Sequence, residues 1–320
     1  MNGSAPVAAP EDRSTGLLIF GILTILMGAL CALFVPLMIF SQSMAARDPA
    51  LADARGLVFG TAMYAGLAVA LIWLGIGSIQ ARRWARALLV ILSWGWLLIG
   101  VGAMASMVLL MPSMLAKAPS SGAKIDPGFQ GVILAISLGF TGVIFVLIPG
   151  IWTFFYSRQT VRATCERRDP IVRWTDRCPL PVLAASLWTG LGAPAMILMP
   201  LAGMAVFPFF GGILSGWPAA VLCVALGLVW LWAAWRLYRL DILGWWTVVA
   251  SVVLFSLSSV LTYSRHDISE IYALMGYSKA QMDLMQQYAL PQSFLTWGVL
   301  AWVLPVLGYL VFIRRYFRKP

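Results

Sequence analysis

The sequence predicts an all-α polytopic integral membrane protein, a helix bundle that crosses the bilayer about eight times. Of its 320 residues, 61% are hydrophobic and 11% are charged, and the mean hydropathy is +0.88. A soluble domain of this length cannot bury so much apolar surface, whereas a bilayer replaces water around the outward faces. Eight long apolar stretches without charge and an uneven distribution of basic residues lead to the same fold class.

Each of the eight stretches is long enough to cross a hydrocarbon core, which takes roughly 20 apolar residues. A helix is the expected conformation, because an open strand would leave backbone groups unpaired in lipid. The expected spans are Leu17–Phe40, Leu57–Ile79, Ala87–Met111, Val132–Tyr156, Leu180–Phe207, Pro218–Trp235, Leu243–Tyr263 and Phe294–Ile313.

The basic residues predict the orientation of these spans. Eight spans place both termini and the even-numbered loops on one side, where 16 of the 22 lysines and arginines fall. Because cytoplasmic loops carry the excess of Lys and Arg, we expect both termini in the cytoplasm and the chain in the plasma (inner) membrane. The 16 are Arg13, Arg82, Arg83, Arg86, Arg158, Arg162, Arg167, Arg168, Arg173, Arg177, Arg236, Arg239, Arg314, Arg315, Arg318 and Lys319.

The net charge of +10 does not indicate a nucleic-acid partner. The charges lie beside the spans, and no segment resembles a recognition helix or a platform for base stacking. Membrane lipids, with anionic headgroups at the cytoplasmic face, are the expected partners. Several tryptophans fall near this boundary, where indole rings prefer to lie; they are Trp84, Trp152, Trp174, Trp235, Trp245 and Trp246.

Two halves of four spans are a further expectation, with chance recurrence in an apolar sequence as the alternative. The recurring residues are Trp73 with Trp230 and Arg82 with Arg239 at an offset of 157, Pro149 with Pro305 at 156, and Pro36 with Pro200 at 164. An even number of spans per half makes these parallel repeats.

The chain is expected to divide into five parts. These are a disordered cytoplasmic tail at 1–15, a first half at 16–157, a basic cytoplasmic linker at 158–178, a second half at 179–314 with an outer amphipathic loop at 264–292, and a basic cytoplasmic tail at 315–320.

The fifth span is the candidate for a broken helix, because Pro194, Pro200 and Pro208 punctuate it. Proline removes a helical hydrogen bond and kinks the helix. One interpretation is a hinge or re-entrant gate, and the other is an ordinary proline kink followed by an aromatic interfacial loop. No expected span contains Asp, Glu, Lys, Arg or His, which argues against a carrier that relies on buried charge.

Small and hydroxyl side chains form two stripes for which we expect packing roles. A stripe of small residues centred on Gly66 predicts close approach of a neighbouring helix to the second span. Ser251, Ser258 and Thr262 share one face of the seventh span, where hydroxyl groups can bond to their own helix or to another. Binding of a neutral solute is the alternative role of both stripes.

Two cysteines, Cys165 and Cys178, lie in the basic linker with no histidine between them. They make half a zinc site at most, which a dimer could complete. Reduced cytoplasmic thiols are the simpler interpretation. We expect no metal and no cofactor.

The outer loop contains the single histidine, and His266, Asp267 and Glu270 could bind a metal or form an acid–base pair. The simpler interpretation is the acidic first turn of an amphipathic helix, with His266 exposed and unliganded. The pattern predicts one short helix over about 267–275 that ends at Gly276, and a second over about 279–290.

The leading functional expectation is a non-enzymatic scaffold, accessory subunit or sensor-like component that contacts a protein partner or a second copy of itself. No phosphate-binding loop, nucleophile elbow or metalloprotease motif is present in the sequence. The alternative is a transporter of a neutral or apolar solute with a site between the two halves. A membrane enzyme that uses the loop around His266 is the third expectation.

Overall fold

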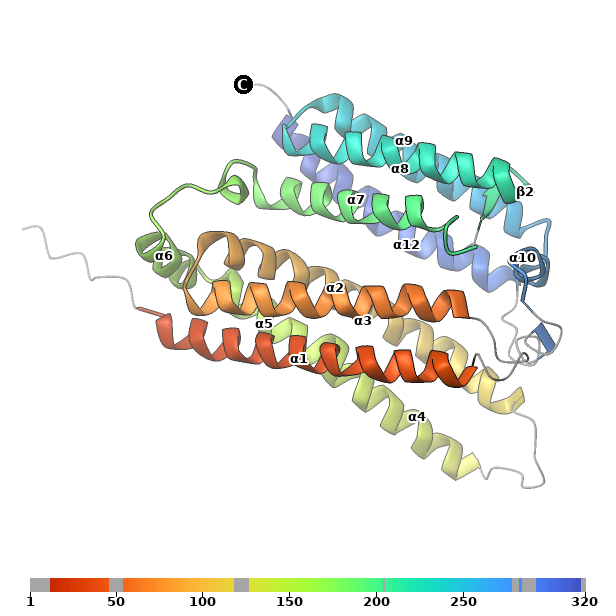
Figure 1. Ribbon diagram of the computed structural model, residues 1–320, viewed down its shortest axis with the longest axis horizontal. Helices are drawn as coiled ribbons and strands as arrows, with labels where there is room; N and C mark the ends of the chain where they lie inside the picture. The colour runs from red at the N-terminus through yellow and green to blue at the C-terminus, as the bar shows by residue number, and fades with distance from the viewer. Residues whose placement is uncertain are drawn as a thin grey trace, which may run out of the picture. The chain divides into compact units, whose positions relative to one another are not determined.

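The computed structural model (Figure 1) describes residues 12–45, 54–117, 127–203, 205–277, 282–283 and 292–317. It is 84% helical, and its described part contains eight helices that are long and apolar enough to cross a membrane. The predicted helical membrane fold is therefore confirmed. Even the most enclosed of these helices has only 39% of its most apolar window buried, so much of its apolar surface remains available to a lipid solvent.

The chain divides into two compact units. Unit 1 comprises residues 1–37, 61–112 and 125–177, and unit 2 comprises the remaining segments, chiefly 178–320. The helices of unit 1 are α1 (Ser14–Ala45), α2 (Ala54–Ile79), α3 (Arg83–Lys117), α4 (Pro127–Gly142), the π-helix η1 (Val143–Leu147), α5 (Ile148–Ser157), α6 (Gln159–Arg168) and the 3₁₀ turn η2 (Trp174–Asp176). The ends of α1 and α2 that join residues 46–53 belong to unit 2.

The π-helical segment has a local cause in the sequence. Pro149 has no N–H to donate to the carbonyl of Phe145, so the α-helical pattern is interrupted there, and Ile148 donates instead to the carbonyl of Val143. The backbone widens toward α3, where a Cβ atom at Gly100 would collide with the Phe145 carbonyl. Glycine at position 100 is therefore what lets α3 pass this segment.

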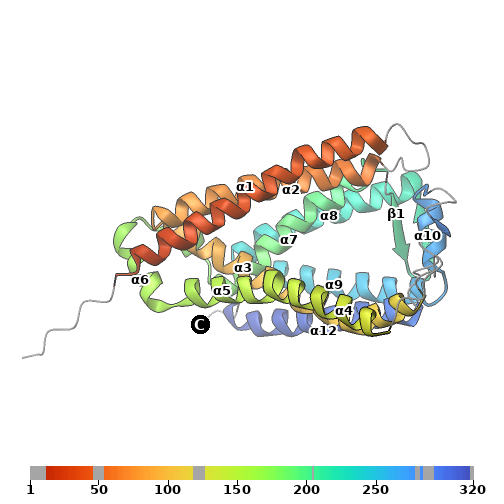
Figure 2. The same cartoon turned by 90° about the horizontal axis from the view of Figure 1, so that it is seen from below.

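Unit 2 contains α7 (Leu180–Leu198), strands β1 (Val206–Phe209) and β2 (Gly212–Ser215), α8 (Gly216–Tyr238), α9 (Ile242–Tyr263), α10 (Ile268–Leu274), α12 (Gln292–Ile313) and the 3₁₀ turn η3 (Arg314–Phe317). Figure 2 shows α7 beside α8 and α9 beside α12, which are contacting pairs. The expected fifth span is wrong at its end, because α7 stops at Leu198 and the following segment forms a hairpin.

The hairpin pairs Val206 with Ser215 and Phe209 with Gly212 in antiparallel register. Its two central residues, Phe210 and Gly211, have φ angles of 43° and 90°. Two left-handed residues are what a tight two-residue hairpin turn requires. The expected aromatic loop therefore contains a paired β-hairpin.

The first two helices of unit 1 approach each other closely at two places, each lined by small residues. A Cβ atom at Gly21 would lie 2.9 Å from the carbonyl oxygen of Gly75, and one at Gly28 would lie 3.0 Å from that of Ala68. Small residues let backbones approach this closely. The close approach expected at Gly66 is wrong, because no described atom lies within 4 Å of a Cβ built there.

The first two helices of unit 2 cross in the same manner. The Ser186 hydroxyl donates to the carbonyl of Ala234 over 2.7 Å, and a Cβ atom at Gly227 would lie 3.0 Å from the carbonyl oxygen of Ala193. In both units, the two close contacts between the helices are therefore seven residues apart along each helix.

The turn that follows the second helix is also alike in the two units. Ala81 ends the α2 turn with φ 52°, and Leu240 ends the α8 turn with φ 58°. In both turns this residue donates to the carbonyl three positions earlier, and the next residue donates to the carbonyl five positions before it. These turns are 159 positions apart, so the expected pairing of Arg82 with Arg239 is two positions out of register.

Candidate functional site

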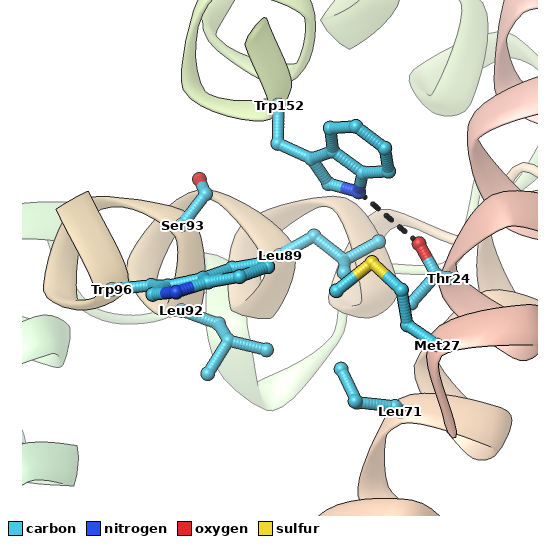
Figure 3. Close-up of a pocket in the computed structure, with 8 residues that line it drawn as sticks. All are labelled: Thr24, Met27, Leu71, Leu89, Leu92, Ser93, Trp96 and Trp152. Carbon is cyan, nitrogen blue, oxygen red and sulfur yellow. Dashed lines mark hydrogen bonds between the residues drawn. The ribbon is translucent and has the colours of Figure 1, made fainter. Parts of the chain in front are cut away.

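A small cavity lies inside unit 1, between α1, α2, α3 and α5 (Figure 3). The lining residues are Thr24, Met27, Leu71, Leu89, Leu92, Ser93, Trp96 and Trp152. The cavity offers about 10 Å³ to the centre of a water molecule, which is room for about one water. Its wall contains no ionisable side chain, so it supplies no group for acid–base or covalent chemistry.

Three polar side chains of this cavity already bond within the protein. Trp152 donates its Nε1–H to the Thr24 hydroxyl over 3.3 Å, and that hydroxyl donates to the Phe20 carbonyl over 2.7 Å. The Ser93 hydroxyl donates to the carbonyl of Val90. Sequence reasoning placed Trp152 at the membrane boundary and missed this role, although a buried indole N–H always needs an acceptor.

A cluster of charged residues covers one end of unit 1, where α1 begins, α2 turns into α3, and α6 packs (Figure 1). We call it the arginine cluster. Its members are Arg82, Arg83, Arg86, Arg162, Arg173, Glu166, Asp169 and Asp176.

Asp169 is the buried centre of the arginine cluster, with 1% of its side chain exposed. Its Oδ1 lies 3.2 Å from Arg173 Nη2 and 3.8 Å from Arg82 Nη1. Its Oδ2 accepts from the backbone N–H of Arg83 over 3.4 Å. A buried carboxylate is tolerated only with such partners, so Asp169 attaches the segment after α6 to the start of α3.

Glu166 and Asp176 add further links to the same cluster. Glu166 Oε1 accepts from Arg162 Nε over 2.8 Å and lies 3.4 Å from Arg83 Nη2. Asp176 lies 3.8 Å from Arg83 Nη1. The hydrogen bond from Arg162, with the charge of Arg83, lowers the pKa of Glu166.

Apolar and neutral contacts dock α6 beneath this charge network. Val161, Thr164 and Cys165 are buried, and the Thr164 hydroxyl accepts from the backbone N–H of Arg13 over 3.2 Å. Burial raises the pKa of the Cys165 thiol to about 11. The basic segment expected only as a linker therefore contains a helix with a packed face.

The two linker cysteines are both buried free thiols, Cys165 within unit 1 and Cys178 within unit 2. Burial also raises the pKa of Cys178 to about 11. Within the described ranges, no group of three His, Cys, Asp or Glu side chains could hold a metal ion. The arrangement around each cysteine fits a packed neutral thiol.

The three prolines of the expected gate do not lie in one helix. Pro194 is inside α7, Pro200 follows the end of α7, and Pro208 lies in β1 opposite Ile213. A helical hinge that includes Pro208 is therefore wrong. The gate at Pro194 and Pro200 stays a prediction.

The hydroxyl stripe of α9 binds the hairpin turn through hydrogen bonds. Ser258 accepts from the N–H of Phe210 over 2.9 Å and donates to the carbonyl of Pro208. Thr262 accepts from the N–H of Gly211 over 3.1 Å. The packing role expected for the stripe was right in kind, but its partner is a hairpin that the sequence did not predict.

His266 and Glu270 form a pair, with 2.8 Å between Nδ1 and Oε2. The His266 side chain is 32% exposed, less than expected. Asp267 does not join them, because it caps α10 by accepting from the N–H of Ser269, which lowers the pKa of Asp267. Helix α10 and its stop at Gly276, with φ 84°, confirm the first predicted outer helix.

The second outer helix, expected over about 279–290, lies almost wholly outside the described residues. Asp241 caps the start of α9, because its carboxylate accepts from the N–H of Leu243, and it pairs with Arg236.

Arginine and tryptophan side chains meet at the end of unit 2 where α9 begins. The guanidinium of Arg314 lies 5.3 Å from the ring centre of Trp245, and that of Arg239 lies 4.2 Å from Trp235. Trp245 is buried and donates to the carbonyl of Leu310 over 2.7 Å. Its indole therefore fastens α9 to α12 and does not face lipid.

No protein-family model, curated protein or solved structure matches this chain. A functional inference has to start from the geometry above.

Proposed function

We propose that this protein is a non-enzymatic membrane scaffold, accessory subunit or sensor-like component. The observation that carries the proposal is the use of polar side chains to join helices. Ser78 donates to the carbonyl of Leu17 and bonds to the hydroxyl of Tyr156 over 2.7 Å. Ser186 and Trp245 likewise donate hydrogen bonds to backbone carbonyls of neighbouring helices. These polar groups are used in contacts between helices, so few of them are available to bind a substrate.

The proposal includes a duplicated architecture of two four-span halves. The shared close contacts between helices and the shared left-handed turns at Ala81 and Leu240 support it. It also includes the cytoplasmic placement of both termini in the plasma (inner) membrane, which the basic residues support. Anionic headgroups at that face are the proposed lipid partners.

Native mass spectrometry of the protein, extracted from its own membranes in a mild detergent, tests this function. A scaffold or subunit should leave the membrane with a second protein, or a second copy, at a fixed stoichiometry. Re-addition of the purified partner should restore the same complex. A single chain that instead conducts a solute into liposomes would overturn the proposal.

The transporter alternative keeps its site between the two halves. The cavity of unit 1, with the hydroxyls of Thr24 and Ser93 in its wall, has room for only about one water and is too small for a solute. Uptake of neutral solutes into liposomes that contain the purified protein, compared with empty liposomes, tests this alternative, and saturable uptake would support transport. The enzyme alternative depends on the His266–Glu270 pair, and hydrolytic activity abolished by His266→Ala would support it.

A further inference from the structure

Arg86 is the fourth residue of α3 and carries a charge without a carboxylate of its own. No described carboxylate lies within 4.0 Å of its guanidinium. Its Nε–H is buried and has no hydrogen-bond partner. A buried charged donor without an acceptor is unfavourable, because it has lost water without a replacement. This donor is therefore available to a bound anion.

The neighbouring carboxylates are already engaged by other arginines. Glu166 is shared by Arg83 and Arg162, and Asp176 pairs with Arg83. Asp169 is taken by Arg82 and Arg173. The arginine cluster therefore has five guanidinium groups and three carboxylates, a surplus of two positive charges, and Arg86 is the member that pairs with none of these carboxylates.

Arg162 is the second basic group near this position. Its partner Glu166 also pairs with Arg83, and Arg83 and Arg86 are neighbours on α3 because they are three positions apart. The Arg162 side chain is 65% exposed, and that of Arg86 is half-buried. The two guanidinium groups can therefore contact one small anion from the two helices.

We propose that Arg86 and Arg162 bind a phosphate group. Guanidinium groups present a planar fork of donors that matches phosphate oxygens and forms strong, charge-assisted hydrogen bonds. The group can belong to an anionic phospholipid headgroup, since the cluster lies at the end of apolar spans, or to a soluble phosphorylated compound. This site goes beyond the scaffold role and does not depend on it.

Binding measurements on the full chain in dodecyl maltoside test the proposal in two arms. One arm titrates dioleoylphosphatidylglycerol against dioleoylphosphatidylcholine and counts bound lipid by native mass spectrometry. The other titrates inorganic phosphate against chloride at equal ionic strength and records the thermal midpoint. Binding in the lipid arm alone assigns a headgroup, and binding of inorganic phosphate assigns a soluble phosphate source.

Arg86→Gln should weaken binding about tenfold in the arm that responds. The matched control is Arg158→Gln, which removes the same charge from an exposed arginine whose guanidinium lies over the Phe154 ring. Equal losses in both variants would indicate diffuse attraction and overturn the site, as would no binding in either arm. If Arg86→Gln does not fold, the exposed Arg162→Gln decides, and unchanged binding in that variant also overturns the proposal.

Discussion

At the scale of single residues, Gly100 shows how one missing side chain determines local structure. The carbonyl of Phe145, left without an α-helical donor by Pro149, occupies the space that a Cβ atom at position 100 would need. The sequence contains the proline as a signal, but the facing glycine is 49 positions before it. Only the packing of α3 against the π-helical segment shows that the two belong together.

Gly100→Ala should destabilise the protein by about 1–3 kcal/mol, because the added methyl group forces the backbone of the π-helical segment to move. Unfolding in detergent, followed by tryptophan fluorescence, measures the loss. The control is Gly139→Ala on α4, where a Cβ atom meets no described atom within 4 Å. Equal stability of the two variants would show that the close approach is not present.

The lowered pKa of Glu166 makes the arginine cluster sensitive to acid. A carboxyl group whose pKa falls on folding stabilises the protein above its unfolded pKa, and this contribution disappears as the pH falls through the folded pKa. The thermal midpoint should therefore decrease below about pH 4, and less steeply in Glu166→Gln. Parallel curves for the two proteins would contradict this role.

At the scale of elements, the hairpin and α9 depend on each other. A two-residue turn exposes backbone N–H groups, and the hydroxyls of Ser258 and Thr262 accept from both of them. The sequence shows the hydroxyl spacing along the helix and the aromatic run of the hairpin. It does not show that these features meet, because they are about 50 positions apart.

Replacing both clamping residues, with Ser258→Ala and Thr262→Val, should release the turn and cost about 1 kcal/mol for each lost hydrogen bond. Hydrogen exchange of the amides of Phe210 and Gly211 should accelerate. Ser251→Ala is the control, because the Ser251 hydroxyl bonds only to the carbonyl of Thr247 in its own helix. Accelerated exchange in the control would point to a general loosening of α9.

At the scale of the whole molecule, the distribution of basic residues predicts the threading of the chain. With an even number of spans, residues 1–13 and 314–320 share a side, and the loop around Ala123 lies on the other. The described part of the structure contains eight helices of sufficient length. Their even number agrees with the predicted number of spans, and the side on which the termini lie stays a prediction from the basic residues.

Cysteine labelling in a cysteine-free background tests the topology. A thiol introduced by Ala123→Cys should react with an impermeant maleimide added outside the cell, whereas Lys319→Cys should react only after the membrane is opened. Reaction of the Ala123→Cys protein exclusively from the cytoplasmic side would reverse the assignment.

The sequence by itself determined the fold class, the positions of seven of the eight spans to within a few residues, and the outer helix that ends at Gly276. These features follow from hydropathy, from helical spacing and from the conformational freedom of glycine, all of which act over short distances along the chain. The fifth span failed because Pro200 and Pro208 belong to a turn and a strand that remain apolar. Hydropathy cannot distinguish such a segment from a continuing helix.

The tertiary structure decided the contacts on which the proposals rest. The close approach of Gly21 to Gly75 and the pairing of Asp169 with Arg82 join residues far apart in sequence. These contacts depend on how helices pack, which hydropathy along the chain does not show. The isolation of Arg86 is likewise visible only once every nearby carboxylate has been assigned to another arginine.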